Sequence, residues 1–315
     1  MEGLTDYITK SDWEDIFTVT FVLVDDAWPT LPMEALPRRR RGPAPEMSDS
    51  EVVTIALFID SIFDGDEEKG LAFIRQYHPT LFPTLLDDSR FNRRRRDLWA
   101  AMEALRCHFR DAWREAHPQE HDIAFLRVID SAPIPICTYS RGSRCQSIPL
   151  DQRDEWFGVC TSKKTKFFGP RCHATVYLDQ MIDSWCLAPG SYHDLRPVPA
   201  LLEGQRSLAA IGDKAYISPD LDSEVWEDGE HLIFPLRKVN QKVQWPKGIQ
   251  AILGKIRHRI ETAFSVLTTT FHLGNLGSRS FSGMVTRATT RVLAYTLSFF
   301  LAEILTPDVV TYQPC

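Results

Sequence analysis

Apolar side chains recur at helical spacing over the first part of the chain. They crowd the window from Trp13 to Leu23, and a second helical block begins at Ser89. Between the two, Ser48-Asp49-Ser50-Glu51 has the form of a capping box, which predicts the start of a helix. The basic segment 37–43 holds two prolines and a glycine, which predicts a linker. We expect an all-helical region up to about residue 120.

From about residue 121 the pattern changes to short apolar runs, which are typical of strands. Two of these runs form a predicted hairpin that turns at Asp179-Gln180, and two others end in an acidic residue. The predicted strands are 124–130, 172–178, 181–187, 208–213 and 231–235, and helices are expected over 198–202, 218–226 and 249–269. Strands that alternate with helices in this way indicate an α/β fold with a mixed five-stranded sheet flanked by helices.

The longest apolar run, Val292–Leu301, is too short to span a bilayer and predicts a buried helix. No secretory signal is visible in the first ten residues, so we expect a cytoplasmic protein without a membrane contact. The seven cysteines form no Cys-x-x-Cys pair, which favours reduced thiols. A zinc site of Cys145, Cys160, Cys172 and His173 is the alternative, although its spacing matches no closed zinc pattern.

Charge is distributed unevenly along the 315 residues, whose formal net charge is −6. Between His231 and Ala302 the only acidic residue is Glu261, in a field of lysines and arginines. Such a lone carboxylate is either a salt-bridge partner or a metal ligand beside a polyanion. A second basic cluster, 93–96, would crowd the first turns of the block that begins at Ser89. This is unfavourable for the helix dipole unless an anion such as DNA phosphate lies nearby.

Three carboxylates stand where they would meet in the folded chain. Asp130 and Asp213 each end a predicted strand, and Glu261 lies on a predicted helix. Two carboxylates at the ends of neighbouring strands repel each other unless a divalent cation neutralises them, and Mg²⁺ takes oxygen ligands of this kind. A third carboxylate would complete a two-metal site for phosphodiester chemistry.

The segments around these acids resemble the catalytic blocks of the DDE transposases of bacterial insertion sequences. The three blocks are Val128-Ile-Asp-Ser-Ala-Pro-Ile-Pro135, Ile211-Gly-Asp-Lys-Ala-Tyr216 and Arg257-His-Arg-Ile-Glu-Thr-Ala-Phe264. The resemblance covers about residues 47–300 and includes the segments 47–53, 89–95, 162–164, 168–169 and 189–194.

The resemblance implies an RNase H-like fold, Mg²⁺ (or Mn²⁺) held by Asp130, Asp213 and Glu261, and cleavage at the terminal inverted repeats of the element. The freed 3′-hydroxyl would then attack target DNA. Arg257 stands one helical turn before Glu261, as in related transposases. The Tyr and Lys that accompany it in one large branch are replaced by Gly254 and Thr268, so the hairpin-forming route is not implied.

The expected partner is double-stranded DNA, bound by a homodimer that pairs two element ends. The residues expected to contact DNA are Arg93, Arg94, Arg95, Arg96, Lys163, Lys164, Lys214, Lys255, Arg257 and Arg259. We interpret His173 as a satisfied core histidine, with metal or phosphate contact as the alternative. We interpret His193 and Asp194 as a plain turn with an Asx contact, with a role in shaping the site as the alternative.

The expected domains are a helical DNA-binding region over 1–120, an RNase H-like catalytic domain over 121–305 and a tail over 306–315. Two other functions fit the same residues. One is a related metal nuclease that cuts without rejoining, and the other is an inactive DNA-binding descendant that acts as a repressor. Intact carboxylates at all three positions speak against the second.

Overall fold

A computed structural model describes residues 13–38, 45–117, 123, 125–160, 164–237 and 244–305. The chain divides into two compact units, each treated by itself below. The helical unit joins residues 1–113 to residues 267–315, and the sheet unit comprises Arg114–Val266. This differs from the expected division, because the stretch from Leu267 to Leu305 clusters with the amino-terminal helices and not with the sheet. The expected tail, 306–315, lies outside the described residues.

The helical unit is built around α3, whose start the sequence predicted. Ser48 caps this helix: its hydroxyl accepts from the N–H of Glu51 at 3.1 Å, and the Glu51 carboxylate accepts from the N–H of Ser48 at 2.5 Å. The capping box is therefore confirmed. The helices of the unit are α2 (Trp13–Ala27), α3 (Asp49–Ile62), α4 (Glu67–Tyr77), α5 (Asp88–Asp97), α6 (Trp99–Ala116) and α10 (Phe281–Leu305), and α3 contacts α2, α4, α5 and α10.

Helix α10 carries the longest apolar run of the chain and packs against α2, α3 and α5. By length and composition alone it is the one described helix that could cross a membrane, yet 61% of its most apolar window is buried inside the protein. Its threonines bond within the helix; the hydroxyls of Thr290 and Thr296, for example, donate to backbone carbonyls four residues earlier. A buried helix was predicted here, and this is confirmed.

The arginine-rich segment differs from its prediction. We expected one helix with arginines in its first turns, but two helices meet at Leu98. Helix α5 begins at Asp88, with the side chain of Asp87 as its cap, so that residues 94–96 form its last turn. The helix dipole favours cations at this end, and no external anion is needed to explain the cluster.

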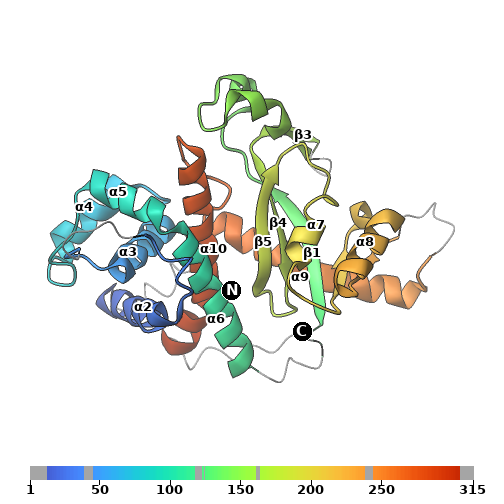
Figure 1. Ribbon diagram of the computed structural model, residues 1–315, viewed down its shortest axis with the longest axis horizontal. Coiled ribbons are helices and arrows are strands. Elements are labelled where there is room, and N and C mark those ends of the chain that lie inside the picture. The colour runs from blue at the N-terminus through green and yellow to red at the C-terminus, as the bar shows by residue number, and fades with distance from the viewer. Residues whose placement is uncertain are drawn as a thin grey trace. The chain divides into compact units, whose positions relative to one another are not determined.

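The sheet unit holds the five strands that the apolar runs predicted. They are β1 (Leu126–Pro133), β4 (Pro170–Val176), β5 (Ile182–Pro189), β6 (Ala209–Gly212) and β7 (Leu232–Pro235), in the order β5-β4-β1-β6-β7. Figure 1 shows β5, β4 and β1 side by side. Strand β1 pairs antiparallel with β4 and parallel with β6. A central strand with these two kinds of neighbour, in a mixed sheet flanked by helices, gives the RNase H-like arrangement that the resemblance implied.

Helices cover both faces of this sheet. Ile129 is fully buried in a cluster with residues of α7 (Val198–Leu202) and α8 (Pro219–Gly229). The next residue, Asp130, bonds to Arg257 on α9 (Lys247–Thr269). Because consecutive residues of a strand point to opposite faces, α9 lies on the face away from α7 and α8.

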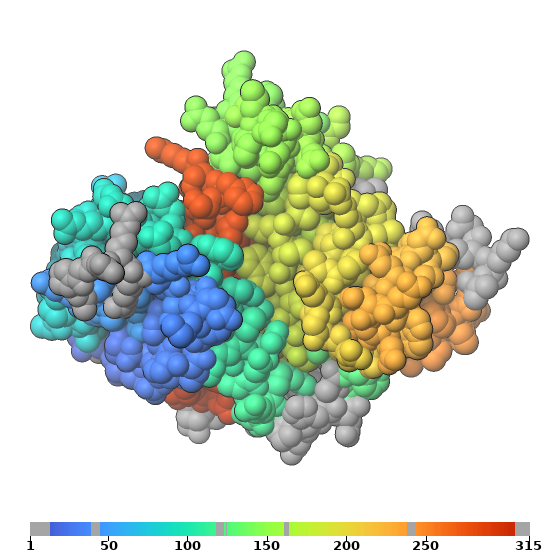
Figure 2. Space-filling model, in the orientation of Figure 1, coloured from blue at the N-terminus to red at the C-terminus, as the bar shows by residue number. Residues whose placement is uncertain are grey.

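A segment between β1 and β4 was not predicted to have structure of its own. Residues 134–169 contain a two-stranded sheet of β2 (Phe157–Cys160) and β3 (Thr165–Phe168), and they stand out as a light-green lobe in Figure 2. The lobe returns to the main sheet at Gly169, which has φ +151°. A Cβ there would lie 2.1 Å from the carbonyl oxygen of Ile134, so only glycine fits.

Candidate active site

Asp130 and Asp213 lie on neighbouring parallel strands. Val128 pairs with Ile211 in register, so that both acids stand two residues beyond the same pair. Asp213 directly follows β6, as predicted. Asp130 was expected to end its strand, but β1 continues to Pro133 because its antiparallel pairing with β4 extends further than its pairing with β6. The backbones of Asp130 and Asp213 therefore lie at neighbouring positions of the sheet.

The Gly-Asp-Lys-Ala-Tyr block forms a compact turn after β6. One carboxylate oxygen of Asp213 accepts from the N–H of Ala215 at 2.6 Å, which caps a short 3₁₀ turn over Lys214–Tyr216. A Cβ at Gly212 would lie 2.7 Å from the ring of Tyr216, so glycine is required for this ring to pack against the strand. The block thereby fixes the position of Asp213.

Arg257 on α9 joins the other two carboxylates. Its Nη2 lies 3.0 Å from Oδ2 of Asp130, and its Nη1 lies 2.9 Å from Oε1 of Glu261. Glu261 is one turn along the same helix and also contacts Nδ1 of His258 at 2.6 Å. One guanidinium thus bridges a strand carboxylate and a helix carboxylate.

Electrostatics at the site follow from this packing. Burial raises the pKa of Asp130 above its ordinary value, and the charge of Arg257 opposes that rise. Burial alone would lower the pKa of Arg257, but Asp130 and Glu261 outweigh it and the pKa is raised. The Asp213 charge acts on both groups, raising the pKa of each. The positive charge of Arg257 therefore favours the ionised form of the partly buried Asp130 carboxylate.

The donor chemistry fits a hard divalent cation, although the side chains are not arranged as a finished metal site. In the part of the chain that the structure describes, no group of three His, Cys, Asp or Glu side chains is placed to hold a metal ion. Carboxylate oxygens of Asp130 and Glu261 are instead both within 3.0 Å of one positive group. A Mg²⁺ ion takes such oxygens and would compete with Arg257 for them.

The zinc alternative gains no support from the described residues. Cys172 is 1% exposed, and burial raises the pKa of its thiol. A zinc ligand must be a thiolate, which this environment disfavours. The described cysteines, Cys107, Cys137, Cys145, Cys160, Cys172 and Cys186, are free thiols, as predicted.

The basic residues expected to contact DNA lie partly in the sheet unit, described in this paragraph, and partly in the helical unit, described in the next. Lys214 is exposed beside Asp213, and Lys164 is exposed at the start of β3. Lys255 and Arg259 are each two residues from Arg257 on α9, about 200° around the helix axis, so they point away from the carboxylates. Lys163 lies outside the described residues.

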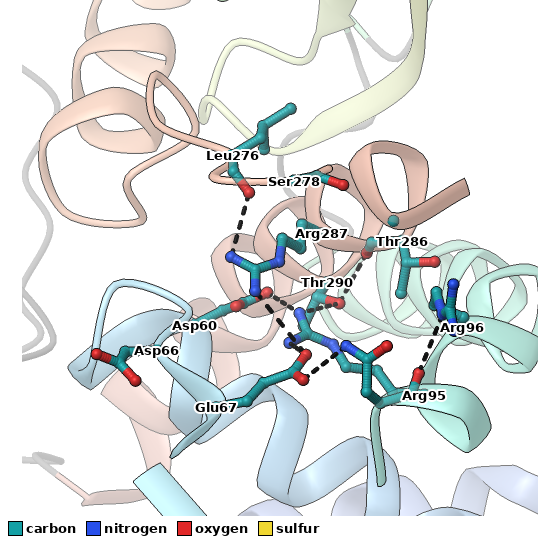
Figure 3. Close-up of polar contacts among 12 residues, drawn as sticks. Asp60, Asp66, Glu67, Arg95, Arg96, Leu276, Ser278, Thr286, Arg287 and Thr290 are labelled. Carbon is teal, nitrogen blue, oxygen red and sulfur yellow. Dashed lines mark hydrogen bonds and ion pairs between the residues drawn. The ribbon is translucent and has the colours of Figure 1, made fainter. Parts of the chain in front are cut away.

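Arg95 corrects the expectation for the 93–96 cluster. Its side chain is 1% exposed and forms ion pairs with Asp60 and with Glu67, the latter at 3.0 Å (Figure 3). Arg94 is also engaged, by Asp49 at 2.5 Å and by the carbonyl oxygen of Met47 at 2.6 Å. Both guanidiniums hold the helical unit together and are not available to phosphate. Arg93 is exposed and Arg96 is half-buried.

A polar cluster lies behind the site, and its contacts were not predicted from the sequence. Asp194 was expected to make an Asx contact in its own turn, but its carboxylate accepts from the hydroxyl of Ser131 at 2.6 Å. His173 is buried, as expected, yet neither of its ring nitrogens has a hydrogen-bond partner. The available signal was that Ser131 follows Asp130 directly and that Asp194 ends the segment 189–194.

The family model described as a transposase DDE domain matches residues 126–297, more than half of the chain. No curated protein and no solved structure matches the sequence.

Proposed function

Because the chain belongs to the transposase DDE-domain family, we propose that it is the transposase of a bacterial insertion sequence and that Asp130, Asp213 and Glu261 are its metal ligands. The observation that carries the proposal is the bridge made by Arg257. The guanidinium of Arg257 contacts both Glu261 of α9 and Asp130, and Asp130 lies beside Asp213 in the sheet. Asp213 supports the proposal through its charge, which acts on both Asp130 and Arg257.

The proposed reaction is phosphodiester hydrolysis followed by strand transfer. Water attacks phosphorus at the element's end, the bond from phosphorus to O3′ breaks, and a 3′-hydroxyl is released. That hydroxyl then attacks phosphorus in a phosphodiester of target DNA, which joins the element's O3′ to the target, breaks the target's bond from phosphorus to O3′ and releases a target 3′-hydroxyl. Two Mg²⁺ (or Mn²⁺) ions held by the three carboxylates would stabilise the charge that develops on the attacking and leaving oxygens.

The chain's own residues orient these groups. The turn over Lys214–Tyr216 holds Asp213, and Ser131 and Arg257 each bond to one oxygen of Asp130. Lys214 is proposed to bind a phosphate beside the scissile bond. Further phosphate contacts are proposed for exposed or half-buried basic residues, namely Arg93, Arg96, Lys164, Lys255 and Arg259. The proposed partners are the element's inverted repeats and target DNA, paired by two copies of the chain.

Pre-cut DNA ends test this function. The inverted repeats that the proposal expects on either side of the gene would supply the end sequence, and the purified full chain is mixed with such ends, Mg²⁺ and a supercoiled plasmid. We expect covalent joining of the 3′ end to the plasmid. Cleavage of uncut ends without any joining would leave the metal nuclease as the function, and binding without cleavage would leave the inactive repressor.

A further inference from the structure

Four polar side chains gather on the sheet face opposite α9. Ser131 pairs with His173 across β1 and β4, and Arg171 pairs with Pro133, so these side chains share a face. Asp194 reaches them from the loop after β5. Its Oδ1 lies 2.6 Å from the hydroxyl of Ser131, 3.9 Å from Nη1 of Arg171 and 4.0 Å from Nδ1 of His173. The cluster lies directly behind Asp130.

Ser131 connects this cluster to Asp130. Its hydroxyl donates to Asp194, while its backbone N–H donates to Oδ1 of Asp130 at 2.8 Å. The other oxygen of Asp130 accepts from Arg257 at 3.0 Å. One residue is therefore bonded to carboxylates on both faces of β1, and its main-chain orientation helps to set the rotamer of Asp130.

Arg171 fixes the other side of the Ser131 hydroxyl. Its Nη1 donates to that hydroxyl at 3.3 Å, its Nη2 donates to the carbonyl oxygen of Val159 at 2.6 Å, and its Nε donates to the carbonyl oxygen of Gly190 at 3.3 Å. Arg171 also supplies the positive charge beside Asp194. His173 does not, because burial lowers its pKa to about 4 and it is neutral near pH 7.

The side chain of Tyr216, in the turn after β6, lies close enough to Asp194 to feel its charge. Its side chain is 1% exposed and its hydroxyl has no hydrogen-bond partner. Burial raises the pKa of this hydroxyl, and the charges of Asp130, Asp194 and Asp213 raise it further. Asp194 thus lies in the same electrostatic environment as two of the proposed metal ligands.

We propose that Asp194 is a positioning residue, which acts through Ser131 to hold Asp130 in the orientation that binds the divalent cation. The proposal rests on the proposed function, in that Asp130 is taken as a ligand. Residues that orient metal ligands typically change metal affinity or activity by about 10- to 100-fold when they are removed.

The test measures Mn²⁺ affinity by electron paramagnetic resonance and, on the same preparations, kcat and KM for cleavage of end DNA. We expect Asp194→Ala and Ser131→Ala each to weaken Mn²⁺ binding about tenfold or more and to lower kcat, with KM for DNA unchanged. The double variant should be no worse than either single variant, because both remove one pathway. Ser131→Thr keeps the hydroxyl and should restore binding, and Glu227→Ala, on the exposed side of α8, is the control.

The outcomes separate this inference from the proposed function. Wild-type Mn²⁺ affinity in folded Ser131→Ala would overturn the positioning role, even if Asp194→Ala fails to fold. Additive losses in the double variant would also overturn it. Asp130→Asn is measured alongside: if it binds Mn²⁺ like the wild type, the proposed function itself fails.

Discussion

The guanidinium of Arg257 lies 3.0 Å from the carboxylate of Asp130, although 127 residues separate the two in sequence. The contact joins α9 to the central strand and places the partly exposed Glu261, one turn further along, beside it. Arg257 therefore supplies positive charge to two carboxylates that the proposed function assigns to metal binding. Arginine and a divalent cation would compete for the same oxygens.

This competition predicts the behaviour of Arg257→Met. Without the guanidinium, Asp130 and Glu261 lose their counter-charge, and the protein should be about 1–3 kcal/mol less stable in the absence of metal. Added Mg²⁺ should then raise the melting temperature more than it does in the wild type. Thermal unfolding with and without Mg²⁺ measures both effects. Lys255→Met, on the opposite side of α9, is the control, and an equal Mg²⁺ shift in all three proteins would contradict the prediction.

Substitution of Arg95 in α5 should lower stability, whereas substitution of Arg93 in the same helix should not. Arg95→Ala leaves the fully buried Asp60 without its ion-pair partner and removes one of the contacts of Glu67, and we expect a loss of about 3–5 kcal/mol in the free energy of unfolding. Arg93→Ala should leave stability unchanged.

The exposed arginine should act on DNA binding instead. Each phosphate contact contributes about −0.9 to the slope of log affinity against log salt, so Arg93→Ala should flatten that slope by about this amount. Affinity for end DNA is measured over a range of salt concentrations, with denaturant unfolding of both variants. An unchanged slope would assign Arg93 to a solvated surface.

His173 predicts a dependence of stability on pH. Its pKa is about 4 in the folded protein and 6.5 in the unfolded chain, so between these values the unfolded chain binds the extra proton. Stability should therefore fall as the pH drops below 6.5, by about 2 kcal/mol at pH 5. In His173→Gln this part of the loss should vanish. Unfolding at pH 7 and pH 5 tests it, and an identical loss in both proteins would contradict it.

Local patterns predicted much of this fold. The capping box at Ser48, the hairpin turn at Asp179-Gln180 and the strand that leads to Asp213 depend on neighbouring residues, and all three are present. The position of Asp213 beside Asp130 depends instead on the order of the strands in the sheet, which no local pattern gives.

Long-range contacts could not be predicted in the same way. Nothing in the sequence around Arg95 shows that this side chain is buried in an ion pair with Asp60. Nothing around Ser131 shows that its hydroxyl donates a hydrogen bond to Asp194, 63 residues away. The split at Leu98 was missed because one apolar face continues across it. The end of β1 was misplaced because antiparallel pairing with β4 carries the strand beyond Asp130.

Glu261→Gln tests the central claim most directly. The amide keeps the shape of the side chain and removes the charge that a metal ligand needs, and loss of negative charge should leave DNA affinity equal or higher. Strand cleavage should fall by orders of magnitude, since each ~1.4 kcal/mol of lost transition-state stabilisation is tenfold in rate. Melting temperature, end-DNA affinity and cleavage are measured on one preparation. Folded Glu261→Gln that binds DNA and cleaves near the wild-type rate would contradict the three-carboxylate site.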